Sequence, residues 1–391
     1  MTQTGLNRLL TDKLSSIKGY KLGVLCHPAS VNENYQHIIE LLYQNKDLKL
    51  TTILAPQHGF MGDKQDNMIE SNHLTDPLTN LPVYSLYSET RMPTREMLKD
   101  IDILIIDLQD VGTRVYTFIY TMAFCLEACK KYGKKVIVLD RPNPINASTV
   151  EGNILDLEFK SFVGQYPIPM RHGMTIAELA LLFNSEYNIF CELEIIAMTN
   201  YKRPMWFDDT CLPWVYPSPN MPTLDTATVY PGGVLFEGTL LSEGRGTTKP
   251  FEIIGSPYIN SQQLIEEINL YKLAGVYFRP IYFEPCFHKF SGKLCAGIQI
   301  HVIDRNIFKP YLTGLAIIKA IIKLYPNNFE WKQAPYEYEY IKLPIDLLIG
   351  NQNIRKKLHN NTDLYYIESS WLNNLNDFLN IRNKYLLYPE Q

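Results

Sequence analysis

The chain has 391 residues, a length that suits two domains better than one hydrophobic core. Its 46% hydrophobic and 20% charged residues are typical of a globular protein, and its net charge of −4 offers no basic surface for nucleic acid or an anionic membrane. No apolar run approaches the ~20 residues of a membrane-spanning helix, and residues 1–16 lack the apolar core of a signal peptide, so we expect a cytoplasmic protein.

Short apolar runs rich in Leu, Ile and Val alternate with helix-length segments through the first 200 residues. The expected strands are 21–26, 49–55, 81–86, 102–107, 135–140 and 193–198. The expected helices are 7–17, 35–45, 94–101, 116–131 and 175–187. Runs that are apolar throughout indicate strands buried on both faces of a parallel sheet. We therefore predict a Rossmann-like, doubly wound, mostly parallel α/β sheet over residues 1–200.

The composition changes after residue 200. Residues 200–250 are dense in Pro, Gly and aromatic side chains, which predicts a packed, irregular connection that lines a cleft. Helices expected at 262–272 and 312–326, strands expected at 275–285 and 295–304, and two helical segments near the C-terminus follow. This pattern predicts a smaller α+β auxiliary domain, which together with the connection occupies residues 201–391.

Four of the expected strands in the first domain end in polar, Gly- or Pro-containing sequence: CHPASVN, APQHGFMGDKQDN, DLQDVGTR and DRPNP. Ligands of open α/β sheets bind outside the carboxyl ends of the strands, so we expect these segments to form one site. No GxGxxG follows the first strand and no GxxxxGK[ST] occurs, so we expect no nucleotide cofactor. The seven scattered cysteines, with no CxxC, and the weak ligand spacing of the loop at 57–71 predict no metal site.

Several polar side chains follow the expected strands directly. Carboxylates there could accept hydrogen bonds from sugar hydroxyls, although each could also cap the helix that follows. The prolines of DRPNP fix the backbone, which suits either a binding turn or a purely structural one. The candidates in these two segments are Asp107, Asp110, Arg114, Tyr116, Asp140, Arg141 and Asn143.

Two further segments carry charged side chains next to glycines. Arg245 lies between two glycines in SEGRG, where it could clamp a ligand carboxylate or form an internal ion pair. Loop 57–71 is expected to face a ligand. The candidates in these segments are Gln57, His58, Glu70, Glu237, Glu243 and Arg245.

The ordered motifs of the chain resemble those of the NamZ-type exo-β-N-acetylmuramidases, a glycoside hydrolase family that acts on peptidoglycan. The resemblance covers most of the chain. It is carried by HPASVN, PQHGFMGD, LPVYSLY, DLQDVGTRVYTFIYTM, LDRPNP, VEG, SFVGQYPIPMRHGMTIAELA, PSPNMPT, YPGGVLFEGT and LSEGRGTTKPFE. It implies a Rossmann-like domain and an auxiliary domain with the active site between them. It also implies release of terminal β-1,4-linked N-acetylmuramic acid from the non-reducing end of a muramic-acid saccharide or muropeptide.

One motif departs from the family. The family's glutamate in PEHG is replaced by Gln57 in PQHG, and an amide cannot donate a proton to a leaving glycosidic oxygen. Another acid of the rim could serve, with the substrate's 2-acetamido group as nucleophile and Gln57 orienting that group. The chain could instead be a catalytically silent sugar-binding relative, or a hydrolase of a related amino or acidic sugar.

On the first interpretation we expect Glu70 or Glu243 to donate the proton and arginines to hold the lactyl carboxylate. The residues expected to act in catalysis are Glu70, Glu243, His58, Gln57 and Asp110. The residues expected to bind substrate are Asp107, Arg114, Tyr116, Asp140, Arg141, Asn143, His172, Asn220, Glu237 and Arg245. The sequence predicts no oligomeric state.

Overall fold

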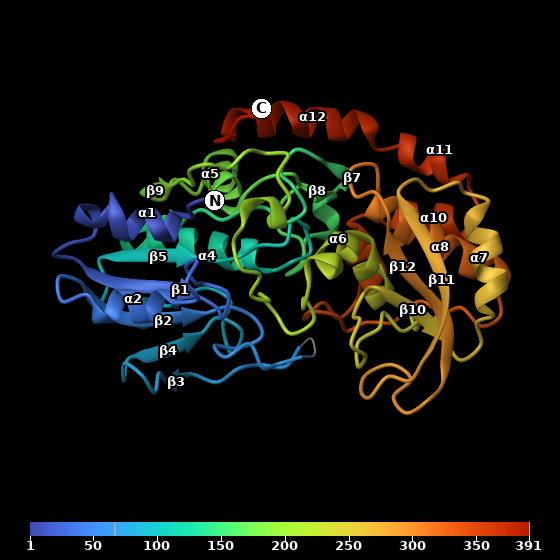
Figure 1. Cartoon of the computed structure of the whole chain (residues 1–391), viewed down its shortest axis with the longest axis horizontal. Coiled ribbons are helices and arrows are strands. Elements are labelled where there is room, and N and C mark those ends of the chain that lie inside the picture. The colour runs from blue at the N-terminus through green and yellow to red at the C-terminus, as the bar shows by residue number, and fades with distance from the viewer. Residues whose placement is uncertain (66–67, 391) are drawn as a thin grey trace.

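The structure, a computed structural model, describes residues 1–65 and 68–390 and confirms the α/β class. Residues 66 and 67 of the expected ligand-facing loop 57–71 lie outside the described residues. The N-terminal part of the chain forms one lobe and the later part a second lobe beside it. The helices α11 (Leu364–Ser369) and α12 (Leu372–Arg382) run along one side of both lobes (Figure 1).

The first lobe is built on a sheet of seven strands in the order β3-β4-β2-β1-β5-β6-β9. All neighbours pair in parallel except β3 and β4, which confirms the expected Rossmann-like arrangement. The strands are β1 (Lys21–Cys26), β2 (Lys49–Ala55), β3 (Leu74–Thr75), β4 (Pro82–Ser85), β5 (Ile103–Asp107), β6 (Lys135–Leu139) and β9 (Leu193–Ile196).

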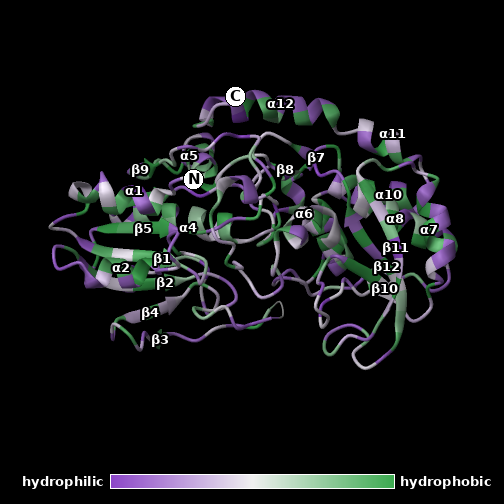
Figure 2. Ribbon diagram, in the orientation of Figure 1, coloured by the Kyte–Doolittle hydropathy of each residue, from purple (hydrophilic) through white to green (hydrophobic). Residues whose placement is uncertain are grey.

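Helices cover both faces of this sheet. Successive strand residues point to opposite sides, so a strand that is apolar throughout contributes side chains to a core on each face. One core joins Val24 to residues of α1 (Gly5–Thr11) and α2 (Ile38–Gln44). The other core joins Leu25 to α3 (Arg95–Leu98), α4 (Phe118–Tyr132) and α5 (Ile176–Glu186). Strands such as β5 are accordingly hydrophobic along their length (Figure 2).

The second lobe contains a three-stranded antiparallel sheet in the order β10-β12-β11. Its strands are β10 (Ile253–Ser256), β11 (Val276–Phe283) and β12 (Cys295–Val302). Its helices are α7 (Ser261–Asn269), α8 (Pro310–Leu324), α9 (Pro344–Ile349) and α10 (Gln352–His359). This is the smaller α+β unit expected from the sequence.

The connection between the lobes is more regular than expected. It contains the helix α6 (Leu224–Gly233), followed by the 3-10 helix η4 (Val234–Gly238). The YPGG sequence resembles a loop, but its glycines serve helix packing: a Cβ at Gly232 would lie 1.9 Å from the carbonyl oxygen of Pro310 in α8. A close backbone contact between α6 and α8 therefore needs glycine there.

The C-terminal segment returns to the first lobe. After α11 (Leu364–Ser369) and α12 (Leu372–Arg382), Arg382 donates to the carbonyl oxygens of Ala147 and Gly173, and Tyr388 donates to Asp140. The domain division at residue 200 stays a prediction. None of the helices in the described ranges is long and apolar enough to cross a membrane.

Candidate active site

A pocket opens at the carboxyl end of the parallel sheet and is lined by residues of both lobes. Its empty volume of about 470 Å³ includes the open solvent at its mouth. The lining residues are Gln57, His58, Val115, Tyr116, Thr117, Phe118, Val163, Ser218, Asn220, Met221, Tyr230, Glu237, Arg245, Phe251, Tyr336 and Glu337.

The elements explain why these side chains meet. Gln57 and His58 follow β2, and residues 115–118 lead into α4, so both groups lie at strand or helix ends on the same edge of the sheet. Glu237 comes from η4. Glu337 comes from the loop between α8 and α9 and reaches the first lobe from the second.

Glu337 is a buried carboxyl group held by two residues of the first lobe. Tyr87 Oη donates to its Oε2 at 2.6 Å, and Gln57 Nε2 donates to its Oε1 at 3.3 Å. Burial, opposed by the Tyr87 hydroxyl and reinforced by the nearby Glu237, raises the pKa of Glu337 to about 7. At neutral pH the group is therefore partly protonated.

Glu237, in contrast to Glu337, is ionised. Burial favours its neutral form, but the Arg245 guanidinium and the Tyr336 hydroxyl together outweigh burial and lower the pKa of Glu237. Arg245 donates to Oε1 at 2.6 Å, and Tyr336 donates to Oε2 at 2.5 Å. The pocket thus holds one carboxyl group that is partly protonated near neutral pH and one that is ionised.

His58 lies in the same pocket as a neutral acceptor. Its Nδ1 lies 2.8 Å from the carbonyl oxygen of Lys64, so Nδ1 carries the proton and Nε2 keeps its lone pair. Burial lowers the pKa of His58 to about 4. Both His58 (φ 74°) and Glu337 (φ 44°) adopt left-handed backbone conformations, which are uncommon for residues other than glycine and are concentrated at functional sites.

The expected site residues divide into two groups. Those that line the pocket are Gln57, His58, Tyr116, Asn220, Glu237 and Arg245. Those that do not line it are Glu70, Glu243, Asp110, Asp107, Arg114, Asp140, Arg141, Asn143 and His172.

The two acids expected to donate a proton do not have the environment of a donor. Glu243 is buried, which favours its neutral form, but Lys289 at 2.8 Å, His288 at 3.2 Å and Arg245 hold its pKa well below the usual range. It is ionised at any working pH. Glu70 is half exposed and accepts a hydrogen bond from Tyr338 Oη at 3.1 Å.

Two of the arginines expected to bind an anion already have partners inside the protein. Arg114 donates to the carbonyl oxygens of Asn153, Ile168, Leu348 and Ile349. Arg141 pairs with Asp107 at 2.5 Å. These groups hold loops at the sheet edge and join the lobes.

The remaining expected residues lie at the same edge but in structural networks. Asp110 accepts from the NH of Gly112 at 2.7 Å and lies 3.1 Å from His172 Nε2. Asp140 accepts from Thr175 Oγ1, and Asn143 Nδ2 donates to the carbonyl oxygen of Met174. Within the described residues, no cluster of three or more His, Cys, Asp or Glu side chains could hold a metal ion.

The sequence patterns did not identify Glu337. It lies in QAPYEYEY, outside the expected sheet and far along the chain from the other pocket residues. The sequence feature that could have pointed to Glu337 is its place between two tyrosines after a proline, since aromatic side chains commonly flank sugar sites. Only the fold brings it next to Gln57.

Comparisons with known proteins agree with this architecture. The family model "Exo-beta-N-acetylmuramidase NamZ, N-terminal" matches residues 22–225, and the corresponding C-terminal model matches residues 228–388. The chain is 48% identical over 386 residues to a Bacillus subtilis (strain 168) protein named peptidoglycan beta-N-acetylmuramidase NamZ, covering 99% of this chain and 91% of the relative.

Two crystal structures of DUF1343 family proteins from Bacteroides fragilis NCTC 9343 have a similar fold. One has a TM-score of 0.90 at 32% identity, covering 99% of both chains, and the other a TM-score of 0.77 at 28% identity, covering 100% of both. With both family models spanning most of its length, the chain belongs to the NamZ exo-β-N-acetylmuramidase family.

Proposed function

We propose that the chain is an exo-β-N-acetylmuramidase that releases terminal β-1,4-linked N-acetylmuramic acid from the non-reducing end of peptidoglycan fragments. Family membership and the activity named for the B. subtilis relative support this function. The observation that carries it is the pair Glu337 and Glu237, which line one pocket with the pKa of Glu337 raised and that of Glu237 lowered. Glycosidases use such a pair to separate the acid from the charged carboxylate.

Glu337 is the proton donor in this proposal. Its raised pKa keeps a proton available near neutral pH, which it transfers to the glycosidic oxygen as the bond to the anomeric carbon breaks. Glu243 lacks that proton, and Glu70 lies outside the pocket.

Glu237 is the ionised carboxylate of the pair. Arg245 and Tyr336 hold both of its oxygens, so its orientation is fixed before substrate binds. Its negative charge stabilises the positive charge that develops at the anomeric carbon.

Gln57 has a positioning role. Its Oε1 accepts from Thr117 Oγ1 at 2.6 Å, which directs its NH₂ toward Glu337. The chain therefore keeps an acid at this point of the pocket although PEHG is replaced by PQHG.

Hydrolysis of para-nitrophenyl β-N-acetylmuramide tests for turnover, and hydrolysis of a β-1,4-linked N-acetylmuramic acid–N-acetylglucosamine disaccharide, whose leaving sugar needs a proton, tests the assigned acid. We expect the wild type to hydrolyse both substrates and Glu337→Gln to lose about 10²–10⁴-fold in kcat on the disaccharide, the usual contribution of a general acid. Glu237→Gln should be similarly impaired. Glu266→Gln, on the exposed surface of α7, is the matched control. An inactive wild type would favour a sugar-binding relative, and an active Glu337→Gln would place the acid elsewhere.

The substrate in this proposal is a muramic-acid saccharide or muropeptide, and the site of action is the cytoplasm. Fractionation of cells that produce the chain, followed by detection with an antibody, tests the location. Recovery outside the cytoplasm would contradict it.

A further inference from the structure

The N-terminus of α4 opens into the pocket. Residues 115–118 line it, and α4 continues from Phe118 for 15 residues. In the described chain no acceptor binds the backbone NH of Phe118 or Ile119, whereas the NH groups of Tyr120 and Thr121 both donate to Thr117 O. Unpaired NH groups at a helix N-terminus are suited to an anion.

The residue that would normally cap this helix end is engaged elsewhere. Thr117 occupies the N-cap position, but its side chain makes no capping hydrogen bond and instead donates to Gln57 Oε1 at 2.6 Å. The first NH groups of α4 therefore stay available to a ligand.

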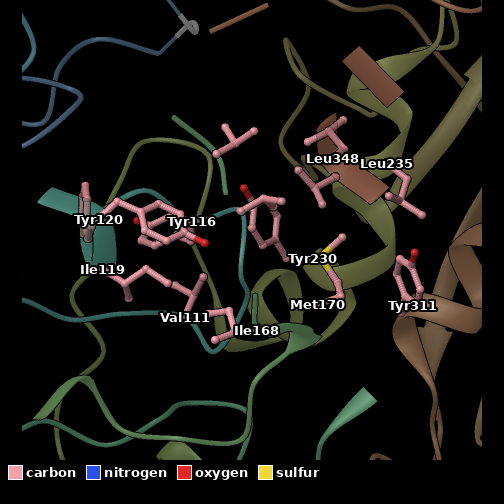
Figure 3. Packing of buried hydrophobic residues seen from close by; sticks show 14 of the residues in the cluster. Val111, Tyr116, Ile119, Tyr120, Ile168, Met170, Tyr230, Leu235, Tyr311 and Leu348 are labelled. Carbon is pink, nitrogen blue, oxygen red and sulfur yellow. The ribbon is translucent and has the colours of Figure 1, made fainter. Parts of the chain in front are cut away.

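Tyr116 provides a second, independent indication. Its side chain is 5% exposed and lines the pocket, where it meets the ring of Tyr230 edge-on with centroids 6.0 Å apart (Figure 3). Ser218 interacts with its oxygen as a donor, which opposes the effect of burial, but the described chain provides no acceptor for the hydroxyl proton. Burial raises the pKa of Tyr116, so the hydroxyl stays protonated and can donate.

The other ionisable side chains near the pocket have partners of their own or are neutral, so the N-terminus of α4 stays open to an anion. Arg245 is engaged by Glu237 at 2.6 Å and Glu243 at 3.4 Å. His58 is neutral, since burial lowers its pKa to about 4. Asp110, the acid near Tyr116, lies outside the pocket lining. Its Oδ2 accepts from the Gly112 NH and lies 3.1 Å from His172 Nε2, whereas its Oδ1 has no hydrogen-bond partner among the described residues.

We propose that the backbone NH groups of Phe118 and Ile119 and the hydroxyl of Tyr116 form a carboxylate subsite. In the substrate this carboxylate is that of the 3-O-lactyl group, which distinguishes N-acetylmuramic acid from N-acetylglucosamine. The identity of the sugar rests on the proposed function, whereas the preference for an anion rests on the helix end and Tyr116.

Calorimetric binding of three monosaccharides to the full chain tests the subsite without requiring turnover. The probes are N-acetylmuramic acid, its neutral lactyl amide and N-acetylglucosamine. We expect the wild type to bind the acid roughly tenfold or more tightly than either neutral sugar, the usual effect of a hydrogen bond to a charged group.

Two variants remove the proposed donors with little change in shape. Tyr116→Phe deletes the hydroxyl, and replacement of Phe118 by phenyllactic acid turns its amide into an ester and deletes the NH. Each should weaken binding of the acid by roughly tenfold and leave the two neutral sugars unchanged. Tyr120→Phe is the matched control, because Tyr120 is also buried with an unpaired hydroxyl but does not line the pocket. The same ester at Phe124, within α4, reports the effect on the helix itself.

The outcomes separate this proposal from the proposed function. Loss of the preference for the acid in both variants, and in neither control, supports the subsite even if the wild type hydrolyses nothing. Equal weakening of all three sugars, unchanged binding of the acid, or a wild type without preference for the acid would overturn it.

Discussion

At the scale of single residues, Glu337 should set the basic limb of the pH profile. The proposed donor is active only when protonated, and burial raises its pKa to about 7. We therefore expect kcat/KM to fall by about tenfold per pH unit above pH ~7. Glu237 must stay ionised, and its pKa is lowered from 4.5, so the acidic limb should lie below that value. Rates measured with the disaccharide from pH ~3 to ~9 check both limbs; a flat profile through the neutral range would contradict the assignment.

Gln57 gives a second test of the same carboxyl. Gln57→Glu replaces an NH₂ that lies 3.3 Å from Glu337 with another carboxyl oxygen. Two carboxyl groups at this distance share one proton, which raises the upper pKa of the pair. The basic limb should therefore move to higher pH by about one unit or more. Gln262→Glu, the same change on the exposed side of α7, should leave the limb in place. An unshifted limb in Gln57→Glu would mean that the two side chains are not coupled.

At the scale of elements, the glycine contact between α6 and α8 positions Glu237, which follows α6 in η4. A Cβ at Gly314 would lie 2.5 Å from the carbonyl oxygen of Gly232. Gly314→Ala should lower the free energy of unfolding by at least about 1–3 kcal/mol and reduce activity, because the helices must separate. Urea unfolding and the muramide assay measure the two effects.

Gly164→Ala is the control for this contact. Its new Cβ would lie nearest to the side chain of Leu155, whose methyl groups are at 3.2 and 3.3 Å, and a side chain can move where a backbone cannot. We expect it to cost less than about 1 kcal/mol. A similar loss of unfolding free energy in both variants would show that the α6–α8 contact is no more closely packed than the contact of Gly164 with Leu155.

The same elements show how far the sequence could predict the molecule. The parallel strands were predictable because apolar runs such as 102–107 are buried on both faces. Helix α6 was not, because its Pro and Gly residues follow a helix-packing constraint that only α8 reveals. Gln57 and Arg245 were found from their positions beside strand ends and glycines. Glu337 was missed because its loop reaches the sheet edge through tertiary structure alone.

At the scale of the whole molecule, the geometry of the pocket depends on a fixed arrangement of the two lobes. Glu337 belongs to the second lobe, but both of its hydrogen-bond donors, Tyr87 and Gln57, belong to the first. The C-terminal segment fastens the lobes together on one side, where α12 crosses between them (Figure 1). A substitution in that segment should therefore affect stability without touching the pocket lining.

Tyr388 is the best place to test this connection. Its buried hydroxyl donates to Asp140 and accepts from the NH of Met198 at 2.8 Å. Burial raises the pKa of Asp140 to about 7, and the Tyr388 hydroxyl partly offsets that rise by stabilising the ionised form. Tyr388→Phe should therefore destabilise the fold by about 1–3 kcal/mol, and by more above pH ~7 than below it, because the lost hydrogen bond is stronger to a charged carboxylate.

The matched control is Tyr385→Phe, three residues earlier. Its hydroxyl donates at 2.7 Å to Glu186, a more exposed carboxylate, so the loss should be smaller than that of Tyr388→Phe. Urea unfolding at pH ~6 and ~8 compares the variants, and the muramide assay should give wild-type kcat for both, since neither residue lines the pocket. Equal losses at the two pH values would rule out a role for the ionised Asp140. A fall in kcat for Tyr388→Phe alone would mean instead that the C-terminal segment controls the geometry of the pocket as well as the stability of the fold.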